Sequence, residues 1–180
     1  YVNPGDVNKY YINRDNLDYL IYSDKVLKSK IESDSRFRNL KKHLDRVSAF
    51  ITSSNKPYGL HRARKAKYFE RPKIIFKSMF DSPKFEYDES KLYFGMSFSS
   101  IIKNNPDYSL KYLLAILNSN LANKWFYIHG KQRGVGVDIG VKKLRNFPIK
   151  KTDLDFQNIT SELVDIVRTC RYQFNFNFEL

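Results

Sequence analysis

The 180-residue sequence has a single cysteine, Cys170, and no apolar run of more than a few residues. One cysteine excludes an internal disulfide and a cysteine-based zinc cluster, and it is typical of proteins in the reducing cytoplasm. A membrane-spanning helix needs about 20 consecutive apolar residues, so we expect no transmembrane segment and a cytoplasmic location. The sequence begins at Tyr1 without a basic-then-apolar leader, and we expect it to be part of a longer protein.

Acidic residues are scarce. The chain has 32 Lys and Arg against 19 Asp and Glu, a net charge of +13. This excess favours a polyanionic partner, with nucleic acid first and an anionic membrane surface second. The counts of 15 Asn and 5 Ala indicate an AT-rich genome, which inflates Lys and aromatic residues in any protein. The placement of the charge is therefore more informative than its total.

The basic residues are concentrated in two segments. From His61 to Lys77, seven Lys and Arg are opposed only by Glu70, and from Lys131 to Lys151, seven are opposed only by Asp138. Clusters of this kind neutralise phosphates, which makes nucleic-acid binding strong and salt-dependent. The alternative interpretation is that both segments are solvated loops.

The predicted elements do not alternate strictly between strand and helix, which favours an α+β fold with small mixed sheets and about three longer helices. Apolar residues at helical spacing predict helices over about 37–51, 109–128 and 154–171. In the third helix, we expect the packed face to be Ile159, Leu163, Ile166, Val167 and Cys170. Short apolar runs predict strands at 19–22, 72–76 and 96–102, and an antiparallel pair of 85–87 with 92–95. The Gly-rich segment 130–140 is expected to be a mobile loop or a hairpin.

No catalytic motif is complete. Asn105-Pro106-Asp107-Tyr108 differs from the Asn-Pro-Pro-Tyr of amino-methyltransferases, and no Gly-rich cofactor loop precedes it. The three histidines have no metal-ligand spacing. Asp81, Glu89 and Lys91 fit only the loose Asp…Glu-x-Lys pattern of magnesium-dependent nucleases. We therefore predict no catalytic residue and no metal ligand.

The remaining candidates are basic and polar side chains that can contact DNA. Tyrosine can stack on bases, Arg and Gln can read guanine and adenine edges, and lysine is suited to phosphate. The first group is Tyr58, His61, Arg62, Arg64, Lys65, Lys67 and Lys73. The second group is Lys131, Gln132, Arg133, Lys142 and Lys143.

Several segments also occur in an order that is typical of one family. They are YLIY (19–22), FRNLKKHL (37–44), KPYGLHRAR (56–64), FERPKIIF (69–76), FEYDESKLYF (85–94), YLLAILNSNLANKWF (112–126) and LRNFPI (144–149). Over roughly residues 17–170 the chain resembles the TaqI-like C-terminal specificity domain. That domain is the target-recognition domain of type IIG restriction–modification enzymes and related adenine-specific DNA methyltransferases. Tyr58 stands where the family usually has Trp, and Phe147-Pro148-Ile149 lacks the family's second proline.

The resemblance implies a single target-recognition domain over residues 17–171 that docks in the major groove of double-stranded DNA. Residues 1–16 would connect it to an upstream domain, and residues 172–180 would form a tail. Methyl transfer, any cleavage and the S-adenosylmethionine cofactor would reside in a methyltransferase domain of the same bacterial parent chain. This fragment would then be non-catalytic and hold no cofactor. Two alternatives stay open: a small magnesium nuclease, and a basic module that grips an acidic protein.

Overall fold

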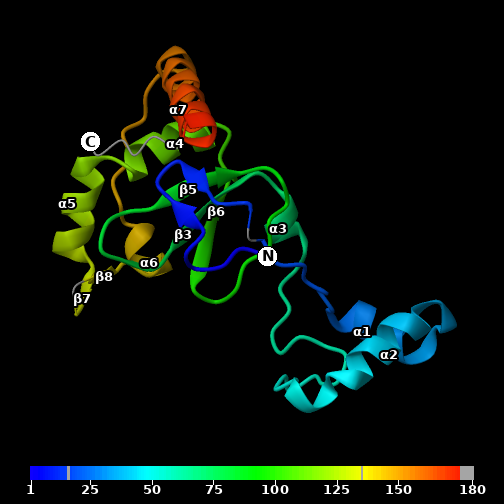
Figure 1. Cartoon of the computed structure of the whole chain (residues 1–180). Coiled ribbons are helices and arrows are strands. Elements are labelled where there is room, and N and C mark those ends of the chain that lie inside the picture. The colour runs from blue at the N-terminus through cyan, green and yellow to red at the C-terminus, as the bar shows by residue number, and fades with distance from the viewer. Residues whose placement is uncertain (16, 135, 175–180) are drawn as a thin grey trace. The chain divides into compact units, whose positions relative to one another are not determined.

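The computed structural model describes residues 1–15, 17–134 and 136–174. The chain divides into an α+β unit, made of residues 1–18 and 69–180, and a helical unit, Tyr19–Tyr68, inserted between them (Figure 1). The predicted α+β class is confirmed.

The main sheet of the α+β unit has β3 (Lys73–Lys77) at its centre, between β5 (Phe85–Asp88) and β6 (Phe98–Ile102), with both pairings antiparallel. The strands expected at 72–76, 85–87 and 96–102 are thus confirmed. The expected pairing of 85–87 with 92–95 is wrong, because β5 pairs with β3 and Phe94 bridges to Val2 instead. The Asp88 carboxylate accepts hydrogen bonds from the backbone N–H groups of Ser90 and Leu92, which holds a turn directly after β5.

A core of apolar side chains joins this sheet to α4 (Leu110–Leu117) and α5 (Asn120–His129). The single helix expected over 109–128 is divided at Asn118 and Ser119. The Asn118 amide donates to the carbonyl oxygen of Phe85 (2.9 Å) and accepts from its N–H (3.1 Å). Ser119 caps the second helix by accepting from the N–H of Ala122 (3.1 Å). The asparagine thus ties the helix break to β5.

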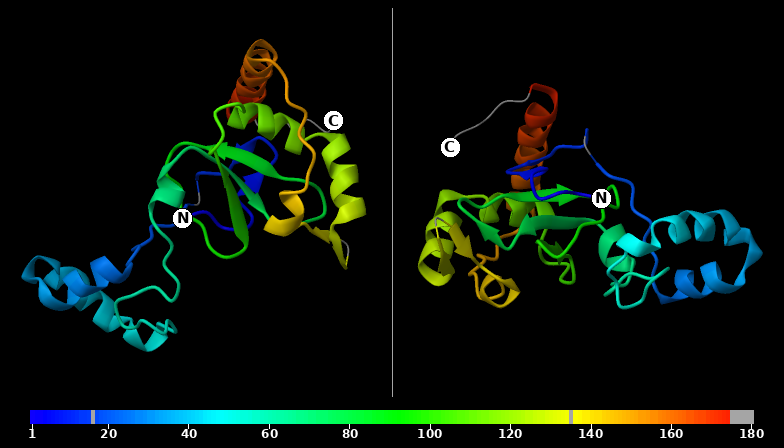
Figure 2. Two further views of the ribbon diagram at one scale, coloured as in Figure 1. Left: turned by 180° about the vertical axis from the view of Figure 1, so that it is seen from behind. Right: turned by 60° about the horizontal axis from the view of Figure 1, so that its bottom comes forward.

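The third expected helix is present as α7 (Leu154–Phe174), which lies beside α4 (Figure 2). Its expected inward face is wrong: Ile159, Leu163 and Ile166 are 57–59% exposed. Gln157 is buried instead, where its amide accepts from the N–H of Ser109 (2.8 Å) and donates to the carbonyl of Asp107 (2.8 Å). The buried face of α7 carries Gln157 and Val164, of which Val164 belongs to the apolar core.

A second sheet has the order β4 (Met79–Phe80), β8 (Gly136–Asp138), β7 (Lys131–Arg133), and all its pairings are antiparallel. Of the two structures expected for segment 130–140, it adopts the hairpin. The short helix α6 (Val141–Leu144) follows it.

The N-terminal residues pack into the α+β unit. β1 (Val7–Asn8) pairs with β2 (Tyr11–Ile12), and β1 contacts β3 and β5. Val2, Val7 and Ile12 are buried. At the other end, the expected tail begins within the last turn of α7, and residues 175–180 lie outside the described residues.

The helical unit contains α1 (Lys25–Ser33) and α2 (Arg38–Arg46), with single 3₁₀ turns at Ser35–Phe37 and Ser48–Phe50. The strand expected at 19–22 is absent, and α1 was not predicted. The helix expected over 37–51 is α2 with its flanking turns. Within residues 19–68, all of which are described, Ile31 is the only buried apolar side chain. The chain leaves this unit through α3 (Lys67–Glu70).

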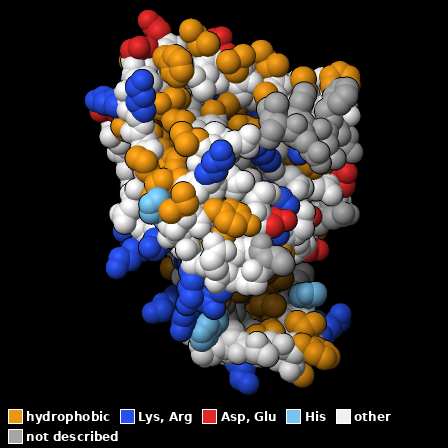
Figure 3. Space-filling model, turned by 90° about the vertical axis from the view of Figure 1, so that its left-hand side faces the viewer, with side chains coloured by type: hydrophobic (Ala, Val, Ile, Leu, Met, Phe, Trp, Pro, Cys, Tyr) orange, Lys and Arg blue, Asp and Glu red, His pale blue; other side chains and the backbone are white. Residues whose placement is uncertain are grey.

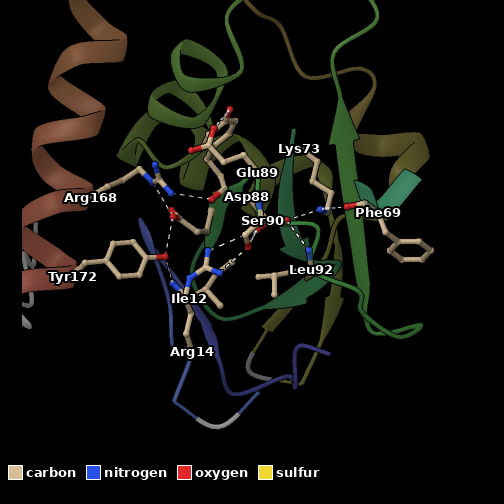
Figure 4. Close-up of polar contacts among 12 residues, drawn as sticks. Ile12, Arg14, Phe69, Lys73, Asp88, Glu89, Ser90, Leu92, Arg168 and Tyr172 are labelled. Atoms are coloured by element: carbon tan, nitrogen blue, oxygen red, sulfur yellow. Dashed lines mark hydrogen bonds and ion pairs between the residues drawn. The ribbon is translucent and has the colours of Figure 1, made fainter. Parts of the chain in front are cut away.

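An ion pair buried in the α+β unit links β3 to β5. Lys73 donates to the Asp88 carboxylate (2.5 Å) and to the carbonyl oxygen of Phe69, and both charged side chains are 0% exposed (Figure 4). Asp88 also accepts from the Ser90 hydroxyl (2.6 Å) and lies 3.7 Å from Arg14. Burial alone would raise the pKa of Asp88, but the hydrogen bonds from Lys73 and Ser90 hold it below its usual value.

Glu86, on the same strand, is buried and is held by α7. Arg168 donates to its Oε1 (2.8 Å), and the Tyr172 hydroxyl lies 3.4 Å from the same atom (Figure 4). Among the described residues, Oε2 has no hydrogen-bond partner. Burial raises the pKa of Glu86 to about 7, although the charge of Arg168 opposes the shift.

Replacing Asp88 with Asn should be strongly destabilising, because it leaves the Lys73 ammonium buried without a counter-ion. Losing one partner of a buried pair costs about 3–5 kcal/mol. Urea unfolding measures the loss, with Glu162→Gln on the exposed surface of α7 as the control. Equal stability of the two variants would show that the pair does not hold the sheet.

Glu86 predicts a pH dependence of stability. Its pKa is about 7 in the fold and near 4.5 when unfolded, so the folded state holds the proton over this interval while the unfolded state loses it. The free energy of unfolding should therefore fall as pH rises from 4.5 to 7, by up to about 1.4 kcal/mol per pH unit. Glu86→Gln mimics the protonated carboxyl and should remove this fall. Parallel pH profiles of the two proteins would contradict the assignment.

Candidate nucleic-acid interface

The predicted DNA-contacting residues divide between the two units. Those from Tyr58 to Lys67 belong to the helical unit, and those from Lys131 to Lys143 belong to the α+β unit. The face shown in Figure 3 carries Lys and Arg side chains in several separate groups, with exposed hydrophobic side chains among them.

The basic loop of the helical unit, which we define as residues 59–65, exposes Arg62, Arg64 and Lys65. Its backbone is fixed by residues that precede α1. The Tyr22 hydroxyl accepts from the N–H of Arg64 and donates to its carbonyl oxygen, both at 2.7 Å. The N–H of Leu60 donates to the carbonyl oxygen of Ser23 (2.9 Å). The guanidinium groups therefore extend from an ordered backbone.

Polar side chains that precede the loop in the chain also hold it. The Asn55 amide donates to the carbonyl oxygens of Leu60 (2.9 Å) and His61 (3.2 Å). Nδ1 of His61 lies 2.8 Å from the Ser54 hydroxyl. The imidazole of His61 is exposed and held in place by this contact.

Tyr58 is engaged within the helical unit. Its hydroxyl donates to Asp45 (2.6 Å), and the ammonium of Lys41 lies 5.7 Å from its ring centroid. The hydrogen bond to Asp45 is the main reason why the pKa of Tyr58 is raised. The side chain is half-buried, and base stacking by Tyr58 stays a prediction. Lys67 is exposed, with its ammonium 5.4 Å from the ring centroid of Tyr68.

The β7–β8 hairpin presents the second set. Lys131, Gln132 and Arg133 are all exposed along β7. Gln132 donates to the carbonyl oxygen of Tyr127 (3.0 Å), so one of its amide hydrogens is already used. Gly134 turns the hairpin with φ at +58°, where other residues are strained.

The hairpin is held against the core by close backbone contact. A Cβ at Gly136 would lie 2.9 Å from the carbonyl oxygen of Phe80, so β8 approaches β4 because it carries no side chain there. The following helix, α6, exposes Lys142 and Lys143, while Leu144 packs against the core. These two lysines are free to meet a ligand from solvent.

The prediction that Lys73 contacts DNA is wrong. The side chain of Lys73 is 0% exposed and is bound to Asp88 and Phe69. A lysine that is fully buried in a central strand needs an acidic partner, and Asp88 supplies it. Lys73 therefore stabilises the fold and does not reach a phosphate.

Further cations that were not among the candidate DNA contacts line pockets together with predicted residues. Lys25 and Lys28 of α1 line a pocket with the basic loop. Lys77 and Lys84 line a second pocket, of about 290 Å³, with Arg133. Lys77 belongs to the basic segment 61–77 but was not a candidate DNA contact. Lys25, Lys28 and Lys84 do not stand out in the sequence, because only the fold brings them to the predicted residues.

The two carboxylates of the nuclease pattern come from different sheets. Asp81 follows β4 in the smaller sheet, and Glu89 follows β5 in the main sheet, where it accepts from the Tyr87 hydroxyl (3.1 Å). Over the part of the chain that the structure describes, no group of three or more His, Cys, Asp and Glu side chains could hold a metal ion. The pKa of Asp81 is lowered chiefly by the N–H of Ser82.

No curated protein matches the chain significantly. The family model of the TaqI-like C-terminal specificity domain matches residues 4–149, which is most of the sequence. In the described residues, no helix is long and apolar enough to cross a membrane. The chain therefore belongs to the family of TaqI-like C-terminal specificity domains, whose role is DNA target recognition in restriction–modification.

Proposed function

We propose that this chain recognises a sequence in duplex DNA on behalf of an adenine-specific methyltransferase. The observation that carries the proposal is the combination of family membership with exposed cations on ordered backbone. The basic loop and the β7–β8 hairpin each offer Arg side chains, whose forked donors suit guanine edges. Lysines on α6 are suited to phosphate.

The chemistry belongs elsewhere in the parent protein under this proposal. A methyltransferase domain of the same chain, of the bacterial type IIG kind, binds S-adenosylmethionine and transfers the methyl group in the cytoplasm. This fragment contributes no catalytic residue and positions the target. Its partners are double-stranded DNA and that methyltransferase domain.

The proposal is tested by fluorescence anisotropy of the chain with random-pool duplex DNA, titrated at several salt concentrations without magnesium. Two variants, Arg62→Ala/Arg64→Ala and Lys131→Ala/Arg133→Ala, each remove exposed charge from one of the two sets. On random-pool DNA most molecules lack the recognised sequence, so these cations meet phosphates in this assay. Each variant should therefore reduce the slope of log affinity against log salt by about 1 to 2, because each phosphate contact contributes about 0.9. Lys42→Ala/Arg46→Ala, on the exposed side of α2, is the matched control.

The outcomes separate the alternatives. No binding to DNA even at low salt would overturn the proposal. Binding to heparin as tight as to duplex DNA would favour a basic module for an acidic protein. Cleavage that requires magnesium and is lost in Glu89→Ala would favour the nuclease.

A further inference from the structure

The helical unit contains a pocket of about 270 Å³, and most of the residues that line it have basic side chains. One wall is the first turn of α1 and the other is the basic loop. Asp24 is its only acidic residue. The basic side chains that line it are Lys25, Lys28, His61, Arg62, Arg64 and Lys65.

The two walls are brought together by close packing. A Cβ at Gly59 would lie 3.0 Å from the Asn55 carbonyl oxygen and 3.1 Å from Cδ of Lys28. Glycine therefore lets the aliphatic part of Lys28 lie against the loop, and Lys28 lines the pocket there. Together with the hydrogen bonds from Leu60 to Ser23 and between Tyr22 and Arg64, this makes the pocket part of the folded unit.

The positive charge of the pocket is poorly neutralised. The Asp24 carboxylate is used as the N-cap of α1, where it accepts from the N–H of Leu27 (2.9 Å). Lys28 has only a long ion pair with Glu32 (3.8 Å), a carboxylate that does not line the pocket. Within residues 19–68, every one of which is described, no ion pair involves Lys25 or Arg62. An anion in the pocket would relieve the repulsion among these side chains.

The helical unit around the pocket also has an excess of positive charge. Residues 19–68 hold thirteen Lys and Arg against four Asp and Glu, so most of the net charge of the chain lies in the smaller unit. A unit with so little buried apolar surface and so much charge of one sign suits a polyanionic surface.

We infer that this pocket binds one phosphate of the DNA backbone, with Lys25 and Lys28 as its previously unpredicted ligands. The inference rests on the proposed function, because the phosphate is that of the recognised duplex. Phosphate contacts fix the position of a protein on DNA and carry no sequence information directly. The helical unit thus anchors one point of the duplex, whatever sequence is recognised.

The test compares two double variants of the full chain that lose the same charge from the same unit. Lys25→Gln/Lys28→Gln removes two pocket residues, and Lys30→Gln/Lys42→Gln removes two exposed residues that do not line it. The pocket variant should bind random-pool duplex DNA about tenfold more weakly, as loss of a charged hydrogen bond predicts. Its salt slope should also fall by about 1. The control should lose at most about twofold, the scale of an exposed charge. Lys25→Arg/Lys28→Arg should retain binding.

Thermal unfolding of each variant confirms that the fold is intact before affinities are compared. Equal losses in the pocket variant and the control would overturn the phosphate pocket while DNA binding by the chain, and hence the proposed function, stands. If the wild-type chain binds no DNA, both the pocket and the proposed function are overturned.

Discussion

The buried contact between Lys73 and Asp88 is the constraint on which the α+β unit depends. It crosses from β3 to β5, and Lys73 also binds the carbonyl oxygen of Phe69, where the chain returns from the helical unit. Asp88 extends the network to Arg14 in the N-terminal segment. Because neither charge can be left alone in the interior, the contact holds together the sheet, the N-terminal segment and the residue at which the chain re-enters the α+β unit.

The same unit uses a second buried carboxylate to place α7. Glu86 receives Arg168, and Gln157 binds the start of α4, so polar groups at two points fix this helix along the sheet. The apolar residues Ile159, Leu163 and Ile166 are left on the exposed side. The two units thus differ in what they contribute. The α+β unit holds the β7–β8 hairpin on a packed core, and the helical unit carries basic side chains on an ordered loop.

The sequence predicts those strands and turns whose structure is decided by a local pattern of residues. Pro72-Lys73-Ile74-Ile75 predicts a buried strand. The glycines of 130–140 predict a mobile loop or a hairpin, and the segment forms the hairpin. Burial of Lys73 could not be predicted, because its partner lies 15 residues away in the chain. The break at Asn118 is hidden because apolar spacing continues across both helices, while the side chain that ends α4 bonds to a strand 33 residues distant. Among the candidate site residues, exposure of the hairpin cations follows from local pattern, whereas the pocket formed with Lys25 and Lys28 depends on tertiary packing.

The central claim is that exposed cations of both units bind DNA, whereas Lys73 stabilises the fold. It is tested most directly by acetylating the lysines of the folded chain with and without duplex DNA and measuring each site by mass spectrometry. The account predicts that Lys73 is unreactive in both cases and that DNA protects Lys25, Lys28, Lys131, Lys142 and Lys143. Ready modification of Lys73, or the same reactivity of the surface lysines with and without DNA, would contradict it.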